Sequence, residues 1–172
     1  DSLKNAALAQ QFGAFAPAAQ GQNRTLVLEN DLMRVTFSSK GGRIQDVLLK
    51  KYEKVNTDSA SNDIKGELHL LEDSKNRFEY LIPVQYAAGG AVNTADLYFT
   101  ANQSGNTIAF RADAGQGRYL EQTYTLRPDN YQLDYKVSAN GLQNVLTPGQ
   151  NHLTLNWVNY LDKLERNQEY ER

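Results

Sequence analysis

The chain has no cysteine, one methionine, one tryptophan and two histidines among its 172 residues. Without cysteine it cannot form a disulfide framework, use a thiolate nucleophile or build a cysteine-based zinc site. The absence of cysteine does not by itself assign a cellular compartment. The scarcity of histidine also leaves little material for acid–base or metal chemistry.

A net charge of one sign and a long apolar run are also missing. The 18 Lys and Arg residues nearly balance the 20 Asp and Glu residues, so we expect no nucleic-acid partner. No apolar run approaches the roughly 20 residues that a membrane-spanning helix needs, and neither a signal peptide nor an initiator methionine opens the chain. We therefore expect an excised or mature soluble piece, with the length of one domain.

What the sequence has is repeated alternation of apolar and polar residues, which is typical of half-buried strands. Met33, Val35 and Phe37 share one parity. Similar segments lie at residues 44–49, 67–72, 78–86, 96–101, 107–112, 119–127, 131–139 and 153–157. Turn formers separate the segments. The sequence therefore predicts an all-β fold, an antiparallel β-sandwich of about nine to eleven strands with few or no helices.

Two local features refine this prediction. Gly41-Gly42 lies between two alternating segments and can adopt positive φ without steric cost, which predicts a hairpin turn there. Pro83 has no N–H to donate to a sheet, which predicts an edge strand or a bulge at that point.

The two ends of the chain differ from its middle. Residues 1–24 are rich in Ala and Gln and contain Gly13, Pro17 and Gly21. We predict a flexible linker that is dispensable for folding, with a docked short helix over residues 1–12 as the alternative. Residues 25–160 are expected to form the sandwich domain. Residues 161–172 are expected to be a truncated tail, for which a short helix and a frayed end both stay open.

Few residues suggest chemistry. His69 and His152, with a glutamate, are the residues that could imitate the proton transfer of galactose mutarotases. His69 lies in a predicted strand and His152 directly at the start of one, where a histidine without a catalytic role is commoner. A zinc site needs three or four ligands, and no serine elbow, phosphate loop or dinucleotide fingerprint is present. We therefore predict no catalytic, cofactor-binding or metal-ligating residue.

Aromatic residues offer one further candidate site. Trp157 with Tyr160, Tyr131 and Tyr135 could form a stacking platform for a sugar or a peptide. Aromatic residues in the strands of a sandwich more often belong to the core.

Two stretches carry a family resemblance. Residues 25–52 contain an alternating strand, Gly41-Gly42 and an apolar segment that ends at Tyr52, and residues 123–137 read TYTLRPDNYQLDYKV. In this order they resemble the opening part of the periplasmic domain of YidC membrane protein insertases, and the resemblance covers residues 26–157. It implies a supersandwich of the galactose-mutarotase-like type and a transmembrane helix before residues 1–24. By the resemblance, we expect the later strands of that domain and the membrane core to lie outside this chain.

The resemblance also implies a function. We expect a non-catalytic module on the periplasmic side of the Gram-negative inner membrane, within a protein that assists insertion and folding of inner-membrane proteins, alone or with the Sec translocon. Expected partners are envelope proteins, including Sec accessory subunits and nascent membrane proteins, contacted through a surface patch or an exposed strand edge. A carbohydrate-binding sandwich module and a mutarotase-like enzyme are the alternatives.

Overall fold

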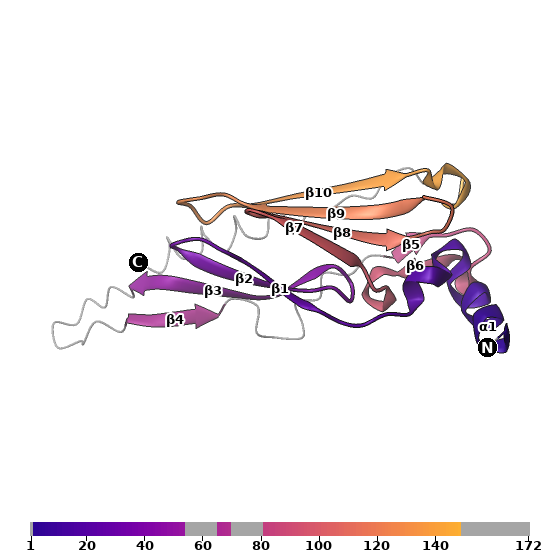
Figure 1. The fold of residues 1–172 in the computed structure, drawn as a ribbon, viewed down its shortest axis with the longest axis horizontal. Coiled ribbons are helices and arrows are strands. Elements are labelled where there is room, and N and C mark those ends of the chain that lie inside the picture. The colour runs from indigo at the N-terminus through magenta and orange to yellow at the C-terminus, as the bar shows by residue number, and fades with distance from the viewer. Residues whose placement is uncertain (1, 54–64, 70–80, 149–172) are drawn as a thin grey trace.

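The computed structural model describes residues 2–53, 65–69 and 81–148 (Figure 1). Two four-stranded antiparallel sheets form two stacked layers, one in the order β1-β2-β3-β4 and the other in the order β10-β9-β8-β7. The prediction of an all-β sandwich is thereby confirmed. The strands of the two layers are β1 (Thr25–Glu29), β2 (Met33–Ser38), β3 (Arg43–Glu53), β4 (Lys65–His69), β7 (Thr100–Ser104), β8 (Thr107–Asp113), β9 (Tyr119–Leu126) and β10 (Leu133–Asn140).

The predicted hairpin of the first layer is present. β2 pairs antiparallel with β3, and a register shift interrupts the pairing between Thr36 and Phe37. Between these strands, Gly41 and Gly42 have φ values of 87° and 55°. Both glycines therefore adopt the positive φ that the turn was predicted to need.

The strands predicted at residues 107–112, 119–127 and 131–139 are also confirmed, each shifted by one or two residues. Their alternation explains the second layer, because successive side chains point to opposite faces of a strand. Along β9 the side chains of Leu120, Gln122, Tyr124 and Leu126 are buried, whereas those between them are only partly buried.

The core lies between the inner faces of the two layers. The ring of Phe37 on β2 lies 4.7 Å from that of Tyr124 on β9, and Phe110 on β8 lies 5.9 Å from Phe37. All three side chains are at most 1% exposed. Burying one such side chain stabilises a fold by about 1.5–3 kcal/mol. The packing of these three rings therefore contributes strongly to holding the two sheets together.

The N-terminal segment differs from the predicted flexible linker. It forms α1 (Ser2–Phe12) and the 3₁₀ helix η1 (Gly13–Ala19), which agrees with the docked-helix alternative. Phe12, Phe15 and Ala18 are buried in the core, and Phe15 is 0% exposed. The spacing of three residues matches the period of a 3₁₀ helix. Tertiary burial thus stabilises a short helix that would be marginal in isolation.

Residues 81–99 differ from the prediction in detail. Of the strand predicted over residues 78–86, the described part forms only β5 (Leu81–Pro83), which pairs with β6 (Ala91–Asn93) around the 3₁₀ turn η2 (Ala88–Gly90). The strand predicted over residues 96–101 begins only at Thr100, after the 3₁₀ turn η3 (Thr94–Asp96). Alternating apolar residues therefore need not belong to a hydrogen-bonded strand, because burial of their side chains alone can account for the alternation.

Of the remaining predicted elements, the strand expected over residues 67–72 coincides over its described part, residues 67–69, with β4 (Lys65–His69). The predicted strand at residues 153–157 and the tail at residues 161–172 lie outside the described residues. No helix in the described part of the chain is long and apolar enough to cross a membrane.

Candidate functional site

The two stretches that carry the family resemblance meet in the interior. The Tyr124 hydroxyl donates a 2.6 Å hydrogen bond to the carbonyl oxygen of Gly42, and Gln122 Nε2 donates a 3.1 Å bond to that of Gly41. The Tyr135 hydroxyl in turn donates to Gln122 Oε1 at 2.6 Å. We call these five residues the inter-sheet junction. Their polar groups are used inside the protein, so the junction fixes the two sheets rather than offering a reactive centre.

The close approach at the junction requires glycine at position 42. A Cβ atom there would lie 2.8 Å from Gln122 Nε2 and 3.0 Å from Phe99 Cγ, at a φ of +55°. The sequence predicted the positive φ but not the contact across the sandwich. The available signal was a polar Gln122 at an inward-facing position of β9, where a buried amide needs a hydrogen-bond partner.

The predicted candidate residues are not assembled into a site by the described part of the structure. His69 is the last residue of β4, and His152, Trp157 and Tyr160 lie outside the described residues. Tyr131 and Tyr135 are half-buried against the core, and the ring of Tyr135 lies 5.0 Å from that of Tyr124. Tyr135 therefore belongs to the inter-sheet junction. Within residues 2–53, 65–69 and 81–148, no cluster of His, Asp or Glu could hold a metal ion.

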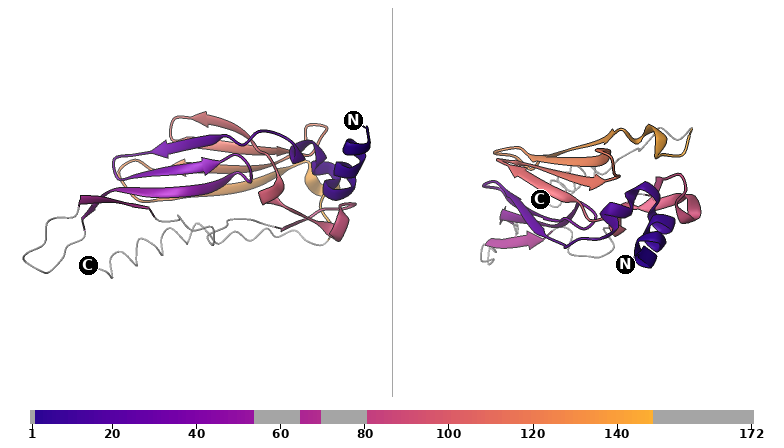
Figure 2. Two further views of the ribbon diagram at one scale, coloured as in Figure 1. Left: turned by 90° about the horizontal axis from the view of Figure 1, so that it is seen from below. Right: turned by 45° about the vertical axis from the view of Figure 1, so that its right-hand side comes forward.

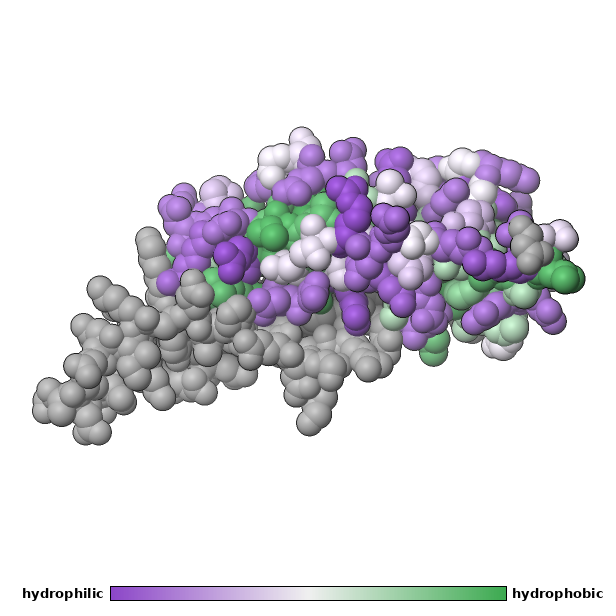
Figure 3. All heavy atoms as spheres, turned by 60° about the horizontal axis from the view of Figure 1, so that its bottom comes forward, coloured by the Kyte–Doolittle hydropathy of each residue, from purple (hydrophilic) through white to green (hydrophobic). Residues whose placement is uncertain are grey.

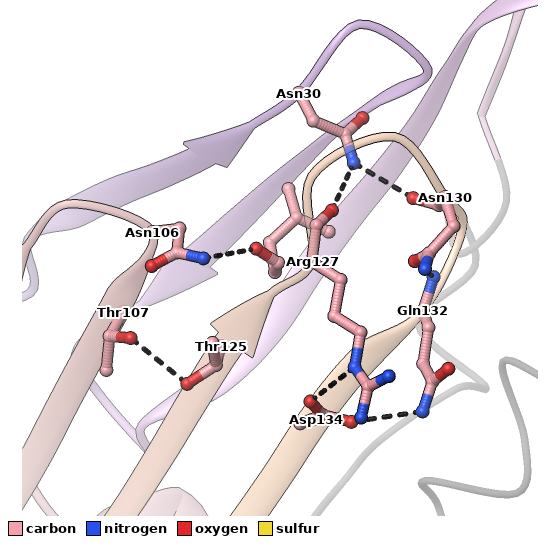
Figure 4. A network of polar contacts seen from close by, with 9 residues as sticks. Asn30, Asn106, Thr107, Thr125, Arg127, Asn130, Gln132 and Asp134 are labelled. Carbon is pink, nitrogen blue, oxygen red and sulfur yellow. Dashed lines mark hydrogen bonds and ion pairs between the residues drawn. The ribbon is translucent and has the colours of Figure 1, made fainter.

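One end of the sandwich is closed by polar contacts between turns (Figure 4). Asn30, in the β1–β2 turn, donates from Nδ2 to the carbonyl oxygens of Arg127 and Asn130 at 2.8 and 2.9 Å. Its Oδ1 accepts from the backbone N–H groups of Leu32 and Met33, each at 2.8 Å. One asparagine thus shapes the turn of the first layer and ties it to the β9–β10 turn of the second. We call this the polar end.

The opposite end is closed by residues 2–23, 81–95 and 141–148, which we call the cap (Figures 1 and 2). These segments are far apart in the sequence but directly bonded in the structure. Gln85 donates from its backbone N–H to the Val145 carbonyl and from Nε2 to the Leu146 carbonyl, each at 2.8 Å. A Cβ on Gly13 would lie 3.0 Å from the Gln85 carbonyl oxygen, so η1 packs closely on the β5 segment. The cap is therefore one contiguous structure.

The surface of the cap differs from that of the rest of the domain. Charged residues make up 22% of the chain, yet residues 5–23, 81–95 and 141–148 contain no Asp, Glu, Lys or Arg. Among the described residues, four large hydrophobic side chains are exposed, and three of them, Leu3 (80%), Leu81 (69%) and Tyr86 (89%), lie on the cap. Figure 3 shows apolar side chains among polar ones at the end of the molecule that carries α1, and a further apolar area in the middle of the same face. The cap is therefore the candidate interaction surface.

Comparison with known proteins assigns the family. The sequence model of the YidC periplasmic domain matches residues 25–168, which include the inter-sheet junction. The chain belongs to the YidC periplasmic domain family. The chain is 34% identical over 99% of its length to the membrane protein insertase YidC of Parabacteroides distasonis, of which it covers 26%. It is 33% identical over 93% of its length to that of Chlorobium phaeovibrioides, of which it covers 27%.

A third relative is the membrane protein insertase YidC of Azobacteroides pseudotrichonymphae. It is 30% identical to this chain over 93% of the chain's length, and the chain covers 25% of that protein. The chain thus spans about a quarter of the length of the curated relatives it matches. No solved structure matches the chain. Family membership gives the location of the domain, the periplasmic side of the bacterial inner membrane.

In this YidC periplasmic domain the strand edges were the predicted contact sites. β1 and β7 are edge strands of the two layers, and Gln103 Nε2 donates a 2.9 Å bond to the Val27 carbonyl oxygen between them. Part of this edge is therefore occupied by the domain's own side chain. β10 is the other edge of the second layer, with Lys136 and Ser138 exposed. Pairing through an edge stays a prediction.

Proposed function

We propose that the chain is the periplasmic, non-catalytic module of a YidC-type membrane protein insertase and that it assists membrane-protein insertion through contacts rather than chemistry. The match of the family over residues 25–168 supports this proposal. The structure adds a physical reason, because the polar side chains at the inter-sheet junction are used to hold the sandwich together. Such a module is rigid and suited to present surfaces.

The proposed substrates are nascent inner-membrane proteins, and the proposed partners include accessory subunits of the Sec translocon. The insertase name of the relatives supports the substrate class. Contacts with Sec accessory subunits are an expectation of the resemblance. The exposed edge strand β10 is the surface we propose for protein partners, since its outward backbone groups can accept a further strand.

The test uses the complete protein of which this domain is part. We expect it to restore insertion of a reporter membrane protein, measured by protease accessibility, in cells depleted of their own insertase. The same protein without residues 25–148 should restore insertion less efficiently. Failure of the complete protein would overturn the insertase proposal, and equal efficiency without the domain would overturn the assisting role. Mutarotase activity in the isolated chain that His152→Ala abolishes would overturn the non-catalytic assignment.

A further inference from the structure

The cap combines three properties that the rest of the described surface does not share. Its segments contain a single charged residue, Lys4, it carries three of the four large hydrophobic side chains that are exposed in the described part of the chain, and it closes one end of an elongated sandwich (Figures 1 and 2). Placing a charged group in an apolar medium costs several kcal/mol, whereas an uncharged surface avoids this cost. The composition of the cap thus fits a partner that is itself apolar.

The conformation of Tyr86 points to the same surface. Its φ is 66°, a region that bulky residues seldom occupy, and its side chain is 89% exposed. Hydrogen bonds hold the turn on both sides, from Val84 N to the Gly90 carbonyl at 3.1 Å and from Gln85 N to the Val145 carbonyl at 2.8 Å. Of the three non-glycine residues with positive φ in the described part of the chain, Tyr86, Gln116 and Asp129, only Tyr86 is aromatic, and strained residues of this kind cluster at functional sites.

We propose that the cap rests on the surface of a phospholipid bilayer, with Leu81, Tyr86 and Leu3 entering the interfacial region. Tyrosine is enriched at this depth because its ring is apolar and its hydroxyl is polar. These three side chains are 69–89% exposed, and they need no matching pocket when the partner is a fluid lipid surface. A protein partner would instead need a packed, complementary interface of about 800 Å². The inference rests on the periplasmic location beside the inner membrane and is independent of the proposed insertase activity.

The proposal makes a specific statement about electrostatics. Because residues 5–23, 81–95 and 141–148 bring no charge to the contact, binding should depend little on the salt concentration or on the fraction of anionic lipid. This separates the cap from basic membrane-binding patches, whose affinity falls as salt screens their attraction to anionic headgroups. The exposed Lys4 is the one basic residue in the first 23 residues.

The absence of native cysteine allows a site-specific test on the full 172-residue chain. Single cysteines at Leu81 and Tyr86 carry an environment-sensitive fluorophore, and Ser104→Cys, at the end of β7 away from the cap, is the control. Vesicles of phosphatidylethanolamine and phosphatidylglycerol should shift the emission of both cap labels to the blue but leave the control unchanged. The shift should persist in high salt and in vesicles of phosphatidylcholine alone.

Unlabelled variants measure the contribution of the cap side chains to binding. Leu81→Thr combined with Tyr86→Asn should reduce partitioning to vesicles at least about tenfold, since burial of one large apolar side chain changes an equilibrium by about this factor or more. Asparagine tolerates positive φ, so position 86 should lose its apolar ring without added strain. The matched control is Val27→Thr, which alters the exposed hydrophobic residue outside the cap, on β1, and should leave partitioning unchanged.

Three results would overturn the proposal. The first is unchanged emission from both cap labels at saturating lipid. The second is binding that disappears in high salt. The third is a blue shift that appears without lipid as the protein concentration rises, because a second copy of the chain would then be the occupant of the cap. Insertion assays on the complete protein are not involved, so these results would leave the insertase proposal standing.

Discussion

The two ends of the sandwich are closed by different physical means. At the polar end, Asn30 connects the turns of the two layers through hydrogen bonds to the carbonyls of Arg127 and Asn130. At the cap, η1 and the segments around it close the core by apolar burial, with Phe15 0% exposed. Hydrogen bonds exposed to water contribute about 1 kcal/mol each, whereas a buried aromatic side chain contributes more.

The way in which each end is closed is reflected in the side chains that its surface presents. The polar end also carries charged side chains, such as the pair of Arg127 and Asp134 at 2.9 Å, which favour contact with water. The cap contains a single charged residue, Lys4, and its outer surface presents Leu81 and Tyr86. The end that is closed by apolar burial is therefore also the end whose surface can bind an apolar partner. Both properties follow from the composition of the three cap segments.

The largest expected effect tests closure by burial at the cap. Phe15→Ala should lower the free energy of unfolding by about 3–5 kcal/mol, because it leaves a cavity in the core. Leu3→Ala, in the preceding helix α1, is the control, and it should change stability by less than about 0.5 kcal/mol since Leu3 is 80% exposed. Urea denaturation followed by circular dichroism measures both. If both substitutions had equally small effects on stability, the result would instead support the flexible linker that the sequence predicted for residues 1–24.

The second prediction concerns the inter-sheet junction, which lies between the two ends. Gly42→Ala should destabilise by about 3 kcal/mol, from the positive φ and from the 2.8 Å approach to Gln122 Nε2 together. Gly105→Ala is the matched control, because Gly105 has a similar φ of +59° but no atom within 4 Å of the added Cβ. It should cost only about 1 kcal/mol. If both variants lost the same stability, the close contact would contribute nothing and backbone strain alone would explain the glycine.

Sequence alone could predict the sandwich because the central strands bury one face and expose the other. The parity of Met33, Val35 and Phe37 survives in β2, where all three are buried. The same reasoning was wrong for residues 96–99, since Leu97 and Phe99 are buried although neither belongs to a strand. It also underestimated the N-terminal segment, because Phe12, Phe15 and Ala18 recur every three residues, a period shared by neither an α-helix nor a strand.

The candidate site could not be predicted because it joins residues from distant segments. No local pattern shows that Gln85 will bond with residues 145 and 146. A count of charges along the chain would nevertheless have marked residues 5–23 and 81–95 as unusual. The inter-sheet junction had a similar signal in Gln122, whose partner depends on the stacking of the two layers.

A third, smaller effect tests closure by hydrogen bonds at the polar end. Asn30→Asp keeps the side-chain oxygen that accepts from Leu32 and Met33 but removes the donor to the second layer. We expect a loss of about 2 kcal/mol, about 1 kcal/mol for each of the two donated bonds. Asn30→Ala also removes the acceptor oxygen and should cost about 1 kcal/mol more. If Asn30→Asp retained full stability in urea titrations, the contact between turns would not contribute to closure.

The smallest effect is expected from an ion pair close to the polar end, between Glu29 on β1 and Lys50 on β3. A hydrogen bond from the Lys50 ammonium is the largest cause that lowers the pKa of the Glu29 carboxyl below its ordinary value of 4.5. A carboxyl whose pKa is lower in the folded protein contributes stability above its unfolded pKa and loses it as pH falls through the folded value.

Glu29→Gln should therefore destabilise the domain at pH 7, by about 0.5 kcal/mol or less because the pair is exposed to solvent. The difference from the parent chain should shrink as pH falls below about 4.5 and the parent's carboxyl becomes protonated. Molar salt should reduce it in the same way by screening the pair. Urea midpoints of both proteins at pH 7 and pH 3 check the prediction. A difference that is equal at the two pH values would instead assign the effect of Glu29 to packing of its aliphatic stem, and closure near the polar end would then also depend on apolar contact.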